Sequence, residues 1–293
     1  MAVIAKFKAL RPVRDKAHLV ATRPYYSYKK NVLKAKMETN PWTLLNIINP
    51  EFDNAKKTKS NSTERFELVK KGYDQFVQDG ILIQDTEPKL YLYKQTSENH
   101  SCIGVIAGAS VEEYLAKKIK IHEATLTSRE AVFERYLDVV GYNAEPVLLS
   151  YTGNKNIQNL IELISRDRPE YEFTTTNRAL HKLWLVNDIK DVKHITCTFE
   201  NIETLYIADG HHRCASSALL SKNKNSNSSS YFMSYLIDEN QLRILNFNRL
   251  VKNLNGLDSC KLLEKIQESY TVTNKQENTW IPNQEYEISM YLN

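Results

Sequence analysis

The sequence predicts an α+β fold in which helices flank a mixed sheet. Strand-like and helix-like segments follow one another without the regular β-α-β alternation of a doubly wound sheet. The 293 residues, 42% of them hydrophobic and 25% charged, suffice for one large domain or two ordinary ones. We expect an irregular and helical N-terminal extension over 1–97, a core over 98–255, and the start of a C-terminal α/β region over 256–293.

The first sixty residues are basic, and Pro12, Pro24, Pro41 and Pro50 are expected to keep them irregular. An amphipathic helix follows over 63–78, and Gly80 ends it. Its apolar face is predicted to consist of Phe66, Val69, Tyr73, Phe76 and Val77.

Two capping-box patterns predict the next helices. Ser110 with Glu113 opens one over 111–119, and Thr127 with Glu130 opens another over 129–140, which Gly141 ends. The remaining helices are expected over 156–166, from about 211 to 222, and over 258–269.

Strands are predicted from period-two alternation and turn signals. The segments 89–97 and 102–110 form an antiparallel pair, and 231–237 with 242–250 form a second hairpin. The polar segment 221–230 is expected to be a mobile loop. The last predicted strand runs to the final residue, which indicates a truncated chain. The other strands are expected over 146–151, 171–176, 182–187, 203–208 and 285–293.

Charge and cysteine content limit the class of protein. A net charge of +4 is too small to indicate nucleic-acid binding. The four cysteines lie far apart without a C-x-x-C pair, so neither a disulfide framework nor a zinc site is expected. The N-terminus lacks the apolar core of a signal peptide, and no run is long enough to span a membrane. We therefore expect a cytoplasmic protein.

The segment 208–217, ADGHHRCASS, carries the strongest functional signal. A buried strand precedes Asp209-Gly210, and a helix follows with His211, His212 and Arg213 in its first turn. Free N–H groups and the helix dipole at such a junction favour phosphate, and Gly permits close approach of the backbone. Arg supplies a planar fork for phosphate oxygens, and Asp209 is expected to orient a substrate hydroxyl or hold Mg²⁺ beside the phosphates.

Other interpretations of this segment were weighed. In the simplest alternative, the segment has no binding function and the two histidines are ordinary polar residues of the surface. Adjacent helical residues point about 100° apart, so His211 and His212 cannot both ligate one metal ion. A thiol catalyst at Cys214 is less favoured than a packing role. The chain has neither a P-loop nor a Rossmann fingerprint.

The connecting segment 120–127 contains His122 and Glu123. A carboxylate near a phosphate site can act as the general base for an attacking hydroxyl, although the residues alone favour an ordinary charged loop. His122 is either a phosphate contact or a buried structural histidine. Candidates for further polar contacts are Arg129, Arg135 and Asn143.

Seven segments together resemble a widespread bacterial and archaeal family catalogued as a domain of unknown function. They are 5–12, Asn40-Pro41, 79–85, 90–93, 120–125, 142–151 and 208–216. That family is related to the nucleotide-dependent free L-serine kinases, whose fold is of the ParB/sulfiredoxin type. The resemblance covers nearly the whole chain, and D-G-H-H-R is its most specific motif.

The resemblance implies a function for two parts of the sequence. Asp209, Gly210, His211, His212 and Arg213 match the segment that holds nucleotide phosphates. His122 and Glu123 match an upstream pair that supplies a catalytic glutamate. The implied reaction transfers a phosphoryl group from ADP or ATP, with Mg²⁺ on the nucleotide, to the hydroxyl of free L-serine or a similar compound.

The sequence departs from the family pattern at Glu134, where Asp is usual, and at Tyr25-Tyr26, where Tyr-Asp is usual. Two other function classes stay open. The first is a non-catalytic regulator that senses nucleotide or another ligand. The second, less favoured, is sulfiredoxin-like redox chemistry through Cys214.

Overall fold

The computed structural model describes residues 2–52, 54–224, 229–244, 248–275, 282 and 284–292. The chain divides into two compact units, Met1–Leu242 and Arg243–Asn293. The expected boundary after residue 97 falls at a turn inside the first unit, and the boundary after 255 falls inside the second. No helix of the described residues is long and apolar enough to cross a membrane.

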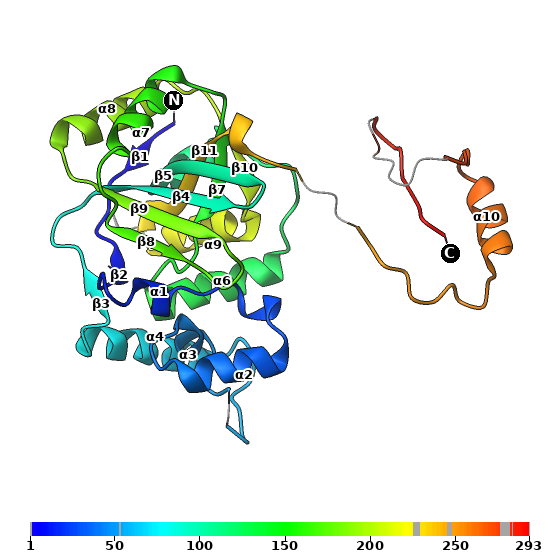
Figure 1. The fold of residues 1–293 in the computed structure, drawn as a ribbon, viewed down its shortest axis with the longest axis horizontal. Coiled ribbons are helices and arrows are strands. Elements are labelled where there is room, and N and C mark those ends of the chain that lie inside the picture. Colours follow the sequence, from blue (N-terminus) through cyan, green and yellow to red (C-terminus); the bar gives the residue numbers. More distant parts are fainter. Residues whose placement is uncertain are drawn as a thin grey trace. The chain divides into compact units, whose positions relative to one another are not determined.

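A nine-stranded mixed sheet forms the centre of the first unit (Figure 1). Its order is β6-β10-β7-β11-β5-β4-β9-β8, and β1 pairs with β5 beside β4. Two neighbouring pairs are parallel, β10 with β6 and β11 with β7, and the other pairs are antiparallel. Its strands are β1 Ile4–Ala5, β4 Leu90–Ser97, β5 His100–Ser110, β6 Ile119–Lys120, β7 Val147–Tyr151, β8 Tyr171–Thr174, β9 Leu180–Val186, β10 Leu205–Asp209 and β11 Tyr231–Asp238. A separate two-stranded sheet pairs β2 Leu10–Pro12 with β3 Leu82–Gln84.

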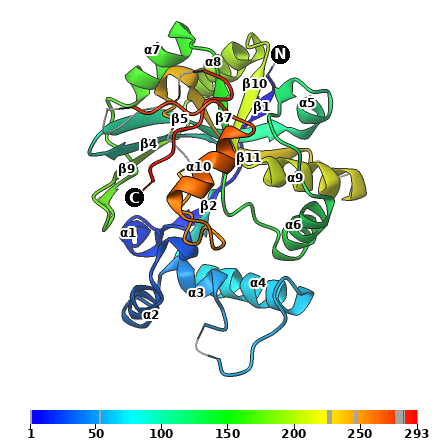
Figure 2. The same cartoon turned by 90° about the vertical axis from the view of Figure 1, so that its right-hand side faces the viewer.

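Helices surround this sheet. They are α1 Ala17–Val20, α2 Lys30–Thr39, α3 Leu44–Ile48, α4 Thr63–Gln78, α5 Val111–Leu115, α6 Thr127–Val140, α7 Lys155–Ile164, α8 Ile189–Glu200 and α9 His211–Lys224. Short 3₁₀ helices are η1 Tyr25–Ser27 and η3 Glu239–Gln241. Helices α7 and α8 lie at one end of the sheet, α2, α3 and α4 lie at the other, and α9 contacts both α5 and α6 (Figure 2). The second unit contains α10 Ser259–Gln267.

Two apolar clusters hold the first unit together. The larger one joins the inner face of the sheet to α7, α8 and α9, and it includes the fully buried Leu92, Leu149, Phe199 and Cys214. The smaller one packs α4 against α3, α6 and β3. Burial of such side chains is the main favourable term in folding, at roughly 1.5–3 kcal/mol for each large apolar group.

Local patterns predict many of these elements correctly. The amphipathic helix spans 63–78 as expected, and Gly80 follows it in the left-handed region, with φ of +67°. Phe66, Val69 and Tyr73 are buried, whereas Val77, which is also expected to belong to the apolar face, is 39% exposed. The pair β4–β5 and the pair β8–β9 are antiparallel as expected.

Five expectations are wrong. Residues 1–60 contain β1, β2 and α1–α3, because the elements are short: Pro12 is the last residue of β2, and α1, α2 and α3 each lie between two successive prolines. Thr127 does not cap α6: it lies inside the helix, and Glu130 instead accepts a hydrogen bond from Thr125. No described residue of 242–250 or 285–292 forms a strand. Residues 221–224 continue α9 rather than a loop, and 225–228, 245–247 and 293 lie outside the described residues.

Gly104 lies in β5 beside the neighbouring antiparallel strand β11. A Cβ added there would be 2.2 Å from the carbonyl oxygen of Leu236, an atom of the sheet backbone that cannot move aside. We expect Gly104→Ala to lower the free energy of unfolding by about 3 kcal/mol, measured by urea denaturation. Gly108→Ala, whose Cβ would be 3.1 Å from the Tyr231 side chain, is the matched control and should cost less. Equal losses would show that the close approach at Leu236 is not the cause.

Candidate functional site at the start of helix α9

The junction between β10 and α9 is built as a strand, a one-residue turn and a helix. Leu205 and Ile207 of β10 are buried while Tyr206 and Asp209 are exposed, and the register against β7 shifts between Ile207 and Asp209. Gly210 follows with φ of +102°, a conformation that residues with a Cβ rarely adopt. Register shifts of this kind often occur beside functional sites because they redirect a side chain.

Helix α9 offers unpaired backbone donors at its start. The N–H of Cys214 bonds to the carbonyl of Gly210 at 3.0 Å. The N–H groups of His211, His212 and Arg213 have no hydrogen-bond partner among the residues that the structure describes. Such donors at the positive end of a 14-residue helix favour an anion.

Arg213 folds back over the turn. Its guanidinium lies against Gly210, where a Cβ would be 3.0 Å from Nε. Nη1 donates to the carbonyl of Pro146 and lies 3.1 Å from a carboxylate oxygen of Glu145, and Nη2 pairs with Asp209. From the sequence, Arg213 is expected to bind phosphate oxygens and Asp209 to orient a substrate hydroxyl or hold Mg²⁺. Instead, Nη1 and Nη2 each have an acceptor, so an anion would have to bind the remaining N–H groups of the guanidinium or displace a carboxylate.

His211 and the distant segment 120–127 come together. The His211 side chain is 3% exposed, its Nδ1 lies 3.3 Å from Glu123 Oε1, and its ring packs edge-on against His122 with centroids 4.3 Å apart. The backbone N–H of His122 donates to His211 Nε2 at 3.4 Å. Because Nε2 accepts, the ring proton is assigned to Nδ1, the ring nitrogen that lies nearer to Glu123.

Burial lowers the pKa of His211 below 6.5, and the neighbouring His122 adds to this effect, while Glu123 and Asp209 oppose it. The neutral ring is therefore the form that the folded protein favours at neutral pH. A neutral ring with its proton on Nδ1 lies beside the Glu123 carboxylate without adding a positive charge there.

The other candidate side chains point elsewhere. The His212 ring lies 6.3 Å from Phe133 of α6, its buried Nδ1 has no partner, and only its backbone N–H lies at the junction. Cys214 is fully buried and its thiol pKa is raised by desolvation, in agreement with packing. Arg135 donates to the carbonyl of Asn61 instead of contacting the junction. Two candidates, Arg129 and Asn143, are exposed and make no polar side-chain contact in the described part of the chain.

A family model described as a protein of unknown function, DUF1015, matches residues 4–293. The chain belongs to the DUF1015 family. No curated protein and no solved structure matches it. Family membership confirms the resemblance at the level of a domain of unknown function. The relationship of this DUF1015 protein to serine kinases and to the ParB/sulfiredoxin fold stays a prediction.

Glu145 is a site residue that sequence reasoning did not find. It lies just before β7, and only the sheet pairing of β7 with β10 brings it to Arg213. No local pattern marks it, because a single acidic residue in a loop is ordinary. In the part of the DUF1015 chain that the structure describes, no three His, Cys, Asp or Glu side chains are grouped to hold a metal ion.

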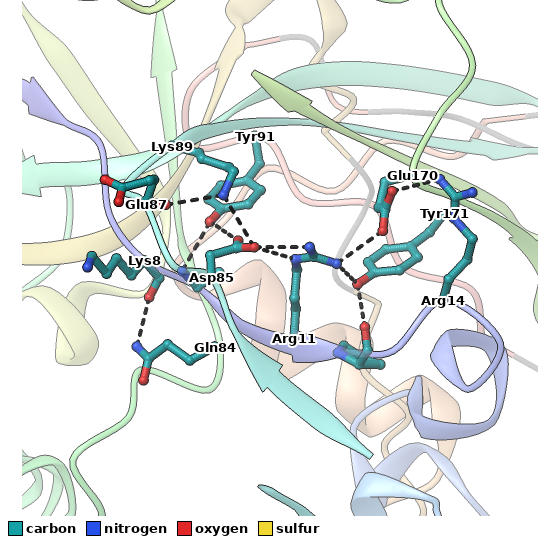
Figure 3. A network of polar contacts seen from close by, with 12 residues as sticks. Lys8, Arg11, Arg14, Gln84, Asp85, Glu87, Lys89, Tyr91, Glu170 and Tyr171 are labelled. Carbon is teal, nitrogen blue, oxygen red and sulfur yellow. Dashed lines mark hydrogen bonds and ion pairs between the residues drawn. The ribbon is translucent and has the colours of Figure 1, made fainter. Parts of the chain in front are cut away.

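A second polar network of this DUF1015 protein was also not anticipated (Figure 3). Arg11 donates from Nε to Asp85 at 3.0 Å and from Nη1 to the Tyr171 hydroxyl at 2.6 Å and to Glu170 at 3.2 Å. Tyr91 also donates to Asp85, at 2.6 Å, and the Asp85 side chain is 4% exposed. The network ties β2 and the end of β3 to β4 and β8.

Two hollows of the structure lie away from the α9 junction. One, of about 210 Å³, is lined by Arg14, Ala17, His18 and the segment 168–173. The other, of about 710 Å³, is lined by Lys30, Asn31, Lys34, Phe52 and Lys57. Neither includes a residue predicted from the D-G-H-H-R motif or from the segment 120–127.

Proposed function

We propose that this DUF1015 protein transfers a phosphoryl group from ADP or ATP to the hydroxyl of free L-serine or a related small hydroxy compound. One observation carries the proposal: Glu123, far away in the sequence, is held by His211 at the start of α9. A carboxylate beside three unpaired helix N–H groups is the pairing that phosphoryl transfer to a hydroxyl requires. The large mixed sheet with flanking helices is compatible with a ParB/sulfiredoxin-type core.

In the proposed complex the nucleotide phosphates lie against the backbone of residues 210–213. The three N–H groups and the free Nε of Arg213 donate to phosphate oxygens. Mg²⁺ binds mainly through phosphates and water with one or two carboxylates, so it would enter with the nucleotide. Asp209 and Glu145, which already contact Arg213, are the carboxylates that would hold it.

Glu123 is the proposed general base. The hydroxyl oxygen of the acceptor forms a bond to the transferred phosphorus. At the same time the hydroxyl proton moves to the Glu123 carboxylate. The bond from that phosphorus to the leaving nucleotide oxygen breaks. His211, whose Nδ1 lies 3.3 Å from the carboxylate, is the neighbour that positions Glu123, and it does not itself take the proton.

The test is a direct assay of the purified protein. L-serine is incubated with Mg²⁺ and either ATP or ADP, and O-phosphoserine is detected by mass spectrometry. We expect product with at least one nucleotide. Nucleotide binding without turnover on L-serine, L-threonine or other small hydroxy acids would contradict the kinase proposal.

A second candidate function is non-catalytic binding of nucleotide or another ligand, as in a regulator. The observation that favours it is the pairing of Arg213 with two carboxylates, because this neutralises the arginine and places negative charge beside the phosphate position. The same assay separates the two candidates, since a regulator binds nucleotide and forms no product.

Gly210 is essential to the proposed phosphate site. We expect Gly210→Ala to weaken nucleotide binding at least tenfold in calorimetry, because the new Cβ strains a backbone with φ of +102° and pushes the Arg213 guanidinium away. Gly141→Ala is the matched control: its φ is +79°, but nothing lies within 4 Å of the added Cβ. If both variants bind nucleotide like the parent, the site is not at this turn.

A further inference from the structure

The hollow of about 210 Å³ lies at the far edge of the sheet from the α9 junction. Its walls are Arg14, helix α1 with Ala17 and His18, the loop 168–170, and β8 (Figure 3 shows Arg14, Glu170 and Tyr171). In the strand order, five strands separate β8 from β10, which places the two sites on the order of 30 Å apart. The hollow is therefore not part of the proposed phosphoryl-transfer site.

The charged side chains of this hollow are unequally paired. Glu170 accepts from both Arg11 and Arg14, at 3.2 and 2.7 Å, and Glu172 pairs with Lys182 at 3.0 Å. Both acidic side chains are thus neutralised. In contrast, Arg168 and His18 have no hydrogen-bond or ion-pair partner in the described parts of the chain. The hollow is left with unpaired donors and a surplus of positive charge.

The network behind the hollow leaves this surplus unchanged and makes the wall rigid. Arg11, Arg14 and Lys89 face only two carboxylates, those of Asp85 and Glu170. The Tyr171 hydroxyl accepts from Arg11 and donates to the carbonyl of Pro12, so its ring is held in place. A wall that is already ordered loses little entropy when a ligand binds.

We propose that this hollow binds a small oxyanion, a carboxylate or a phosphate, through Arg168, Arg14 and His18. Arginine provides the planar fork that matches both kinds of oxyanion. The volume is below the roughly 300–1,000 Å³ of sites for drug-sized ligands, so the ligand is a small metabolite or inorganic ion. The apolar faces of Ala17, Pro169 and Phe173 line the rest of the space.

The indole N–H resonance of Trp184 can report on binding at this site. Its indole N–H donates to the carbonyl of Asp167 at 2.8 Å, immediately before Arg168. We suggest titrating the protein with inorganic phosphate and, separately, with succinate at constant ionic strength, and following the indole N–H resonances by NMR. Trp184→Phe assigns the signal. At least one anion should shift it in a saturable way, and the comparison tells phosphate from carboxylate.

Arg168→Gln should weaken that binding about tenfold, because one charge-assisted contact is lost. The variant should fold normally since Arg168 is exposed and unpaired. Arg166→Gln removes the same charge from an exposed position outside the hollow and should bind as the parent does. The proposal is overturned if neither anion shifts the Trp184 signal, or if Arg166→Gln weakens binding as much as Arg168→Gln.

Discussion

Glu123→Gln is expected to lower the rate of phosphoryl transfer by about 10²–10⁴-fold while nucleotide affinity stays nearly unchanged. The amide keeps the size of the side chain but cannot accept the proton of the attacking hydroxyl, and general-base catalysis contributes a factor of this order. Glu123 contacts His211 and has no contact with the backbone donors of α9, so nucleotide binding should persist. The measurement is kcat from product formation, together with nucleotide Kd from calorimetry.

The matched control for this prediction is Glu162→Gln, on the exposed side of α7. It makes the same chemical change without touching the junction and should leave both kcat and Kd unaltered. A Glu123→Gln protein that turns over at the parent rate would exclude Glu123 as the base. Equal loss of turnover in both variants would point to a change in net charge instead.

Asp85→Asn is expected to lower the free energy of unfolding by about 3 kcal/mol, the largest stability effect of a single polar substitution that we anticipate. The carboxylate is almost fully buried, and it accepts from Arg11 and Tyr91 and faces Lys89. The amide leaves the mostly buried Arg11 without a full counter-charge, and loss of one partner of a buried ion pair typically costs about 3–5 kcal/mol. Urea denaturation followed by circular dichroism measures the effect.

The same residue predicts a dependence of stability on pH. Burial alone would raise the pKa of Asp85, but the hydrogen bonds from Arg11 and Tyr91 outweigh it and hold the pKa below 3.8. The stabilisation is therefore complete above the unfolded-state pKa and is lost as pH falls through the lower folded-state value. The parent protein should lose stability in that acidic range more steeply than the Asp85→Asn variant.

Glu172→Gln serves as the control for the Asp85 network. Its ion pair with Lys182 is about half exposed, and such pairs contribute at most about 1 kcal/mol. If Asp85→Asn destabilises the protein no more than Glu172→Gln, the network does not hold β2 to the sheet edge as the structure indicates.

Elements whose signal is local could be predicted from the sequence. Helix 63–78 combines an apolar period of 3.6 residues with Ser62, which caps Arg65 N, and Gly80, which ends it. In the hairpin of β4 and β5, the turn lies directly between the two strands, so its residues are next to both strands in the sequence. Each of these elements depends on a few neighbouring residues, and the rest of the fold does not change it.

Elements that need a distant partner were predicted less well. The segment 242–250 has a strand-like pattern, but both edges of β11 are already occupied by β5 and β7, so the described residues of this segment have no free edge of β11 with which to pair. The strand expected over 285–293 likewise has no ladder in the described residues. An alternating pattern is not sufficient for a strand, because its backbone groups need a free sheet edge to bond.

The sequence by itself determined the strand-turn-helix junction of residues 205–224, with Gly210 at the turn and three unpaired N–H groups after it. It also named Glu123 as a partner, through the resemblance and not through any spacing. Only the tertiary structure decided that Glu123 contacts His211, that Glu145 and Asp209 neutralise Arg213, and that Arg11 joins Asp85 to Glu170. The physical reason is that ion pairs and hydrogen bonds between segments far apart in the chain depend on strand order and register, which no local pattern encodes.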